Sequence, residues 1–359
     1  MTIDYQIRMI TAHLDCRRIE DPVDTIYEYA SSLGEAGDRI ASEIGVSVWS
    51  KRIVLDYCED SIDEILGSAP YSDALVSLGG LTLRRIDGEA AGDLAENELF
   101  FSILLTDRSW EEARRASDVI HKVADRDPSL ATRFGVNTLG ERIETPYFPL
   151  AATPRNGVVT AGLLYPKYLL NAYRTRGYTG LVEAIREAGR LAVNAVRITA
   201  GETGLAPGGV DLSPSPWMEE STLALVEFIA GVRMPEPGLA HGIALVNKAV
   251  SEAAGELPAT GFNEVQLPVA EDLKLKARVS ELETTARDLA RYSGVCLAGL
   301  DLVVVPANRD WVAGLILEVA GYSLTKGKPL GVRIIPVEGV EPGDKVYLEK
   351  FGETPVIPL

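Results

Sequence analysis

Histidine, cysteine and glutamine are scarce in this sequence. Among 359 residues there are three histidines and three cysteines, and the cysteines (Cys16, Cys58 and Cys296) form no CxxC pair. Their odd number and wide spacing argue against a disulfide framework or a structural zinc site. Glutamine occurs only at Gln6 and Gln266, beside abundant glutamate and arginine. Depletion of amides is typical of proteins from hot environments, so we expect a thermophilic source.

Long hydrophobic runs and targeting segments are absent as well. No apolar stretch reaches the roughly 18 residues that a membrane span needs, and the first residues lack the basic and apolar parts of a signal peptide. Aspartate and glutamate number 52 against 35 lysines and arginines, which gives a net charge of −17. Such a surface repels nucleic acid and anionic lipid. We therefore expect a cytoplasmic protein that binds neither nucleic acid nor membranes.

Several motifs of common enzyme classes do not occur. The sequence has no GxxxxGK[ST], no GxGxxG after a strand, no HExxH and no GxSxG. Their absence argues against a P-loop NTPase, a standard Rossmann dehydrogenase, a zincin and an α/β-hydrolase. Carboxylates that could bind Mg²⁺ are plentiful, but no spacing singles out a set, so any metal or cofactor stays unknown.

What the sequence does contain is an alternation of short apolar runs and longer segments of helical period. The expected strands are 6–11, 46–55, 74–80, 100–107, 297–306 and 331–337. The expected helices are 23–45, 110–126, 179–195, 238–253 and 280–292, with a further helix ending near residue 323. Ser109 is the expected N-cap of the second of these, and Asn308 and Asp310 are candidate caps of the last. Apolar strands separated by helices are typical of a parallel sheet covered on both faces. We expect an α/β domain over residues 1–359, as one unit or two fused halves, with a hairpin at 345–359.

Polar residues near strand ends are the first candidates for a functional site, because ligands of parallel α/β folds gather there. Asp211 and Ser213 alternate on a strand end, so their side chains share a face. Ser213 also precedes a proline and is expected to open a helix whose free N–H groups form an anion site, or else merely to cap that helix. Asp301 leads into an apolar strand and must be paired, capped or catalytic.

Cys296 and His241 complete the catalytic candidates. A thiolate at Cys296 would be a nucleophile if a cation lowered its pKa, whereas burial as an ordinary core cysteine is the alternative. His241 lies near the start of an apolar helix, where the helix dipole favours the neutral ring. That position suits an acid/base or a hydrogen-bond donor, and a structural histidine is the alternative.

Charged residues within strands are expected to anchor an anionic substrate. Only one of Lys51 and Arg52 can point inward, and an inward cation needs an anion, either Asp15 or a substrate carboxylate. Arg333 also lies in an expected strand, and if it points inward it needs an anion as well. The expected substrate-binding residues are Arg333, Lys51, Asp15, Ser213 and Asn137.

Several short motifs follow one another in the order of a known family. They are LDC at 14–16, GDRIASEIGVSVWSKRI at 37–53, VDLSPSP at 210–216, AHG at 240–242, LPVAED at 267–272, CLAGLD at 296–301 and VRIIP at 332–336. Together they resemble the domain-of-unknown-function family seven-eleven, often labelled PFL family protein, along essentially the whole chain. Residues 138–180 follow the family least well.

This resemblance implies a fold rather than an activity. The family is similar in structure to pyruvate formate-lyase, with a ten-stranded α/β barrel of two antiparallel halves, each of five parallel strands. Gly321 stands in a sequence that superficially resembles a glycyl radical loop, but it lies within an expected helix, so we do not expect radical chemistry. The family implies no established catalytic residues.

Two functions fit these observations. The first is an enzyme that acts on a small anionic metabolite inside the barrel, with Asp301 or Asp211 as acid/base and Cys296 as nucleophile. It predicts that these residues and Arg333 converge on one cavity. The second is a non-catalytic, homo-oligomeric protein that binds or senses a metabolite, with a pocket that lacks an acid–base pair. Analogy of fold favours the enzyme.

Overall fold

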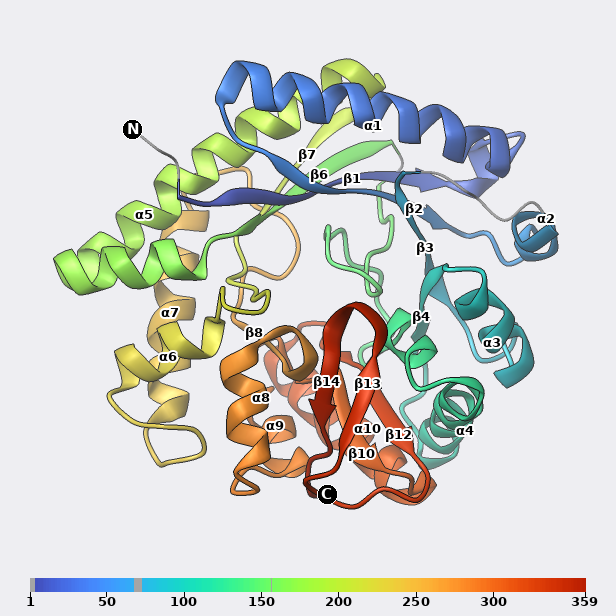
Figure 1. Ribbon diagram of the computed structural model, residues 1–359. Helices are drawn as coiled ribbons and strands as arrows, with labels where there is room; N and C mark the ends of the chain where they lie inside the picture. Colours follow the sequence, from blue (N-terminus) through green and yellow to red (C-terminus); the bar gives the residue numbers. More distant parts are fainter. Residues whose placement is uncertain (1–3, 68–72, 156) are drawn as a thin grey trace.

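The backbone alternates strands and helices, as the hydrophobic pattern predicts. A computed structural model describes residues 4–67, 73–155 and 157–359 (Figure 1). Its strands are β1 (Gln6–Asp15), β2 (Val48–Asp56), β3 (Leu75–Leu81), β4 (Phe100–Leu104), β5 (Phe134–Asn137), β6 (Val158–Leu164), β7 (Ala206–Asp211), β8 (Gln266–Pro268), β9 (Ala298–Asp301), β10 (Val303–Pro306), β11 (Gly331–Val332), β12 (Ile334–Val337), β13 (Lys345–Leu348) and β14 (Gly352–Pro355). Its α-helices are α1 (Pro22–Ile44), α2 (Ile62–Gly67), α3 (Gly88–Glu96), α4 (Trp110–Arg126), α5 (Pro166–Thr203), α6 (Thr222–Ala230), α7 (Leu239–Ala254), α8 (Leu273–Ser280), α9 (Ala286–Tyr292) and α10 (Arg309–Lys326).

Side-chain caps set several helix starts. The Asp21 carboxylate accepts hydrogen bonds from the first N–H groups of α1, which has proline in its first turn and ends at Gly45 in the left-handed conformation. Ser109 caps α4 and Asn308 caps α10, as the sequence predicts. Each cap satisfies an N–H group that has no partner inside its helix.

Eight strands form one sheet, in the order β11-β5-β4-β3-β2-β1-β6-β7. Strands β1 to β5 are parallel to one another, and β6 and β7 are parallel to each other but antiparallel to β1. Strand β11 is antiparallel to β5, at the opposite edge. The mixed α/β class is therefore confirmed. No closed barrel of paired strands is present among the described residues, because the sheet ends at β7 and β11.

A second, short parallel pair, β8–β9, lies beside both edges of the large sheet. The Gln266 N–H at the start of β8 donates to the Pro214 carbonyl just after β7, at 3.0 Å. On the other side, the Arg333 N–H just after β11 donates to the Leu300 carbonyl of β9, at 3.2 Å. The remaining ladders, β10–β12 and the β13–β14 hairpin, involve the C-terminal segment. The hairpin lies within the predicted 345–359 tail.

The strands enclose a long loop between β5 and β6, and the helices lie outside (Figure 1). We call residues 138–155 the inner loop. Five glycines on the strands face it, and a Cβ atom added at any of them would lie 2.0–3.3 Å from an atom of residues 144–152. These are Gly79, Gly135, Gly162, Gly208 and Gly331. Because other side chains would clash there, glycine at these positions makes room for the inner loop.

The sequence mispredicts the segment that begins at Ser213. Residues 212–221 form no helix, and α6 starts only at Thr222, capped by Ser221. Pro214 and Pro216 account for the difference, because the residue before a proline is disfavoured in helical conformation. No helix N-terminus is therefore present at Ser213 to bind an anion.

The expectation drawn from the cysteine count is also wrong. Cys16 and Cys58 are joined by a disulfide across 42 residues, with their Cα atoms 5.3 Å apart. They follow the neighbouring parallel strands β1 and β2, in which Asp15 pairs with Asp56. Sheet register thus brings together cysteines that are distant in the chain, and the cysteine count no longer supports a cytoplasmic location. In the described parts of the chain, no helix is both long and apolar enough to cross a membrane.

We predict that Gly79→Ala destabilises the protein by about 2 kcal/mol or more, as overpacking does in tight cores. The new Cβ would lie 2.8 Å from the Ala151 carbonyl oxygen and 3.0 Å from the Ala152 Cα atom, so backbone must move. Gly321→Ala is the control, because that glycine has no heavy atom in reach and lies in α10. It should be neutral or slightly stabilising. Urea unfolding of both variants measures the difference, and equal stabilities would contradict the packing of the inner loop.

Reduction of the disulfide should lower the free energy of unfolding by about 4 kcal/mol, from the loop-closure entropy of a cross-link of this length. Denaturant unfolding with and without a thiol reductant measures the change. The Cys16→Ser/Cys58→Ser double variant is the control and should not respond to reductant. If both cysteines alkylate readily before reduction, the cross-link is absent and the expectation fails.

Candidate functional site

Two adjoining chambers lie between the inner loop, strands β1 and β2 of the large sheet, and the segments around β8, β9 and β11. Their volumes are about 370 and 50 Å³. Both are lined by Arg8, Arg52, Phe148, Glu271 and Arg333. We call them the larger and the smaller chamber, and together the central cavity.

Strand ends and irregularities aim these side chains at the cavity. Arg8 lies at an irregularity of the β1–β6 ladder, where the register shifts between Ile7 and Met9, and such a bulge re-aims a side chain. Arg52 lies on β2, Asp301 ends β9, and Arg333 stands between β11 and β12. Glu271 belongs to a single 3-10 turn after β8, Val269–Glu271. The site therefore draws on segments from both ends of the chain.

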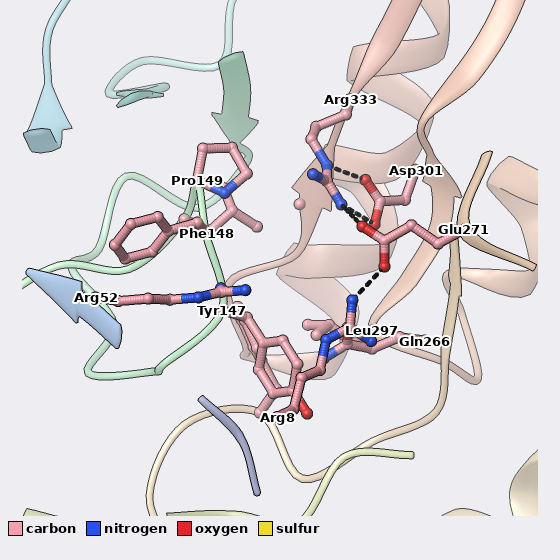
Figure 2. A pocket seen from close by; sticks show the side chains of 13 residues that line it. Arg8, Arg52, Tyr147, Phe148, Pro149, Gln266, Glu271, Leu297, Asp301 and Arg333 are labelled. Atoms are coloured by element: carbon pink, nitrogen blue, oxygen red, sulfur yellow. Dashed lines mark hydrogen bonds and ion pairs between the residues drawn. The ribbon is translucent and has the colours of Figure 1, made fainter. Parts of the chain in front are cut away.

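A buried ion network crosses the cavity wall (Figure 2). Arg8 Nη2 lies 2.5 Å from Glu271 Oε2, and Arg8 Nη1 donates to Ser215 Oγ at 2.6 Å. Arg333 forms a two-pronged ion pair with Asp301 and lies 3.8 Å from Glu271. Burial alone would raise the pKa of Glu271, but Arg8 and Arg333 hold it below its usual value. This carboxylate therefore stays ionised.

Arg52 is the exception in this network. Its Nε donates to Ser50 Oγ and its Nη1 to the Pro146 carbonyl, both at 3.1 Å. Its guanidinium lies 5.0 Å from the centre of the Phe148 ring. Within the described residues it has no carboxylate within 4 Å. Desolvation, reinforced by Arg8, lowers its pKa, although Glu271 and Tyr147 oppose the shift. The more distant carboxylate of Glu271 therefore balances the charge of Arg52 only in part.

Aromatic rings and one lysine form the outer wall of the larger chamber. Trp49 and Trp217 are 4.7 Å apart between ring centres, and Arg8 lies over both rings. Lys350 stands over the rings of Phe100 and Phe351, at 5.4 and 5.2 Å. Desolvation of the ammonium group and, to a smaller degree, Arg52 lower the pKa of Lys350 to about 8, against the opposing effect of Glu271.

Three of the predicted site residues are among those that line the cavity: Lys51 at the larger chamber, and Asp301 and Arg333. Asp301 and Arg333 form an ion pair with each other. The sequence requires a partner for Asp301 and an anion for Arg333, and each of the two residues meets the need of the other. Asp211 and Cys296 are fully buried and are not among the residues that line it. The predicted convergence of all four residues is therefore not found.

Asp211 and Ser213 instead hold loops together. The Asp211 carboxylate accepts hydrogen bonds from Thr145, Ser213, Phe262 and Asn263. Burial raises its pKa, although these donors oppose the shift. The Ser213 hydroxyl also accepts from the Glu264 N–H at 3.1 Å. Both residues thus tie the inner loop and the segment before β8 to the end of β7.

The other predicted residues lie away from the cavity or face away from it. His241 is exposed on α7. Lys51 borders the larger chamber, but its side chain extends to the opposite face of β2 from Arg52, where its end lies against Gly34 and Gly37 of α1. Asp15 caps the turn Cys16–Arg18 and pairs with Arg17.

Asn137 belongs to a turn at the start of the inner loop. Its amide donates to the Glu141 carbonyl at 2.8 Å, and its Oδ1 accepts from the Leu139 N–H at 3.1 Å. Within residues 4–67, 73–155 and 157–359, no group of three or more His, Cys, Asp or Glu side chains is placed to hold a metal ion.

The sequence reasoning missed Arg8, Glu271, Gln266 and Lys350, and preferred Lys51 to Arg52. Arg8 carried a usable signal, because a charged residue inside an apolar strand needs a partner. Strand alternation restricts the inward position to one of Lys51 and Arg52 but does not say which. Lys350 carried none, since it looks like any surface lysine of a terminal hairpin.

Comparison of the sequence with known proteins assigns the chain to a family. Residues 108–349 match the family described as "Uncharacterised ACR (DUF711)". The chain belongs to this family. It is the same domain-of-unknown-function family seven-eleven that the sequence motifs indicate, so that prediction is confirmed.

Similar proteins occur in archaea and bacteria. A "UPF0210 protein" of Pyrobaculum arsenaticum is 29% identical, over 88% of this chain and 79% of its own length. A UPF0210 protein of Methanopyrus kandleri is 26% identical, over 96% and 87%, and one of Lachnospira eligens 25%, over 92% and 83%. Neither the family description nor these names state an activity, so function must be argued from the DUF711 chain itself.

His13 gives a pH test of the inner loop that walls the cavity. It is fully buried on β1; its Nδ1 donates to the Ala152 carbonyl at 3.0 Å, which leaves Nε2 to accept from Thr160 Oγ1 at 2.8 Å. Burial lowers its pKa to about 4, although Glu144 opposes the shift. Because the unfolded chain takes up this proton first, stability is lost as pH falls from about 6.5 to 4.

We expect the wild type to lose up to about 3 kcal/mol more than His13→Gln between pH 7 and pH 4, from a pKa shift of this size. Glutamine keeps a donor and an acceptor but does not titrate. Urea unfolding at a series of pH values measures the difference. A difference between the two proteins that does not change with pH would show that His13 is not held neutral.

Proposed function

We propose that this protein binds a small anionic metabolite in the central cavity, with Arg52 as its main anchor. The observation that carries the proposal is the guanidinium of Arg52, which lines both chambers without a carboxylate partner. A partly buried charge is stable only when an opposite charge or hydrogen bonds compensate it. A carboxylate or phosphate on the ligand supplies that charge, and the volume of the larger chamber suits a metabolite.

The surroundings of the two acidic groups favour binding over acid–base catalysis. Glu271 and Asp301 are both held in ion pairs with arginine, so both carboxylates already serve to balance buried cations. Acid–base pairs in enzymes have environments that push their pKa values apart. The predicted thiol chemistry loses its support too, because Cys296 does not line the cavity.

An enzyme remains the second candidate because of Lys350. An ammonium group with a pKa of about 8, over two aromatic rings at the cavity wall, is suited to act as a base near neutral pH. In that case Arg52 would position the anionic group of the substrate and Lys350 would take the proton.

We also propose that the strands form an interrupted ten-stranded barrel, as the family resemblance implies. One half would contain β1 to β5, and the other β6, β7, β8, β9 and β11. The hydrogen bonds from Gln266 to Pro214 and from Arg333 to Leu300 support this, since they connect the β8–β9 pair to both edges of the large sheet. The homo-oligomer and the thermophilic source stay predictions from the sequence.

Native mass spectrometry and calorimetric titration with small carboxylates and phosphates test the proposed function. We expect a retained or titratable anion, with binding weakened by 10-fold or more in Arg52→Met, in line with the loss of a charge-assisted hydrogen bond. Lys51→Met is the matched control, because it removes the same charge from the opposite face of β2. Equal losses in both variants, or no anion binding in the wild type, would overturn the proposal.

A further inference from the structure

Two buried N–H donors on the wall of the smaller chamber have no hydrogen-bond partner. They are Arg8 Nε and Gln266 Nε2, in residues that are 4% and 6% exposed. Both residues line this chamber. Figure 2 shows Arg8 and Gln266 on the same side of the cavity, away from Phe148 and Pro149.

These donors are unusual among the cavity residues. The other nitrogens of Arg8 are used by Ser215, Pro216 and Glu271. The backbone of Gln266 holds the residue in place at the start of β8, but its side-chain amide forms no hydrogen bond with the described residues. A buried donor without a partner carries a free-energy penalty, which an acceptor brought by a ligand removes.

The charges on the wall of the smaller chamber limit how many negative groups of the ligand can lie there. The guanidinium groups of Arg8, Arg52 and Arg333 face the carboxylates of Glu271 and Asp301. Arg8 and Arg333 are paired with those carboxylates, so the charge on this wall that has no carboxylate partner within 4 Å is that of Arg52. One anionic group balances it, and a second one would lie beside Glu271 and Asp301, which repel it.

We infer that the ligand is a monocarboxylate that also carries an uncharged carbonyl group. Its carboxylate pairs with Arg52, and its carbonyl oxygen enters the smaller chamber, where it accepts hydrogen bonds from Arg8 Nε and Gln266 Nε2. A carbonyl oxygen has two lone pairs and no proton of its own, so it satisfies two N–H donors at once. This inference rests on the proposed function and adds to it the second recognition element of the ligand.

Isosteric probes separate the two recognition elements. Succinamate carries a carboxylate and an amide carbonyl, 4-methylpentanoate replaces that amide by an isopropyl group of the same shape, and succinate replaces it by a second carboxylate. Glutaramate and 5-methylhexanoate extend the comparison by one methylene. One of the two amides, succinamate or glutaramate, should fit the cavity better and bind more tightly than the other. In calorimetric titrations we expect the wild-type protein to bind that amide at least 10-fold more tightly than its hydrocarbon isostere, and more tightly than succinate.

Substitution of the donor then tests its role. Gln266→Met keeps the length of the side chain and removes the amide, so affinity for the amide probe should fall by about 10-fold while that for the isostere stays unchanged. Gln6→Met is the matched control, because Gln6 is the only other glutamine and lies at the start of β1 outside the residues that line the cavity. It should preserve both affinities.

The outcomes separate this inference from the proposed function. If amide and isostere bind equally to the wild type and Arg52→Met weakens both, the anion site stands and the carbonyl subsite is wrong. A preference for succinate over succinamate also overturns the carbonyl subsite. If no probe binds, or Arg52→Met changes nothing, the proposed function and this inference fail together. The wild-type comparison decides the question even if Gln266→Met does not fold.

Discussion

The fold around the central cavity depends on ion pairs between buried side chains that are distant in the sequence. Arg8 from the first strand reaches Glu271, and Arg333 from the last third of the chain reaches Asp301 and approaches Glu271. Charges removed from water are tolerated only when they are paired and hydrogen-bonded, so removing one partner leaves a costly isolated ion. The network therefore fixes the N-terminal strands against the C-terminal ones around a space that stays open.

The inner loop gives this space its second wall. Both ends of the inner loop are held by strand residues such as Asp56. The Asp56 carboxylate accepts hydrogen bonds from Arg142 Nε near one end of the loop and from the Thr153 N–H near the other. The middle of the loop packs against strands in which glycine leaves room for it. The whole of this loop lies in the segment 138–180, which the sequence motifs predict to follow the family least well. Its side chains wall the central cavity.

Local patterns predicted much of the fold and little of the site. Apolar runs marked β1 to β4 within a few residues, and the capping residues Ser109 and Asn308 were readable because a cap acts on its own helix. The Cys16–Cys58 bond and the Asp301–Arg333 pair depend on contacts between distant segments, which periodicity does not encode. To choose between Lys51 and Arg52, one must know which face of β2 points toward the cavity, and the sequence does not give this. A serine followed by a proline looked like a helix start, but the two prolines in this segment keep it extended.

The late position of β11 in the chain has a consequence for biosynthesis. This two-residue strand pairs with β5, and Arg333 directly after it supplies one of the guanidinium groups of the cavity. A nascent chain on the ribosome can form β1 to β5 early, but the β5 edge stays unpaired until β11, about 190 residues later, has been made. Contacts of such high order fold slowly and expose strand edges to aggregation. The wall of the central cavity should therefore be complete only after residues 331–333 have left the ribosome.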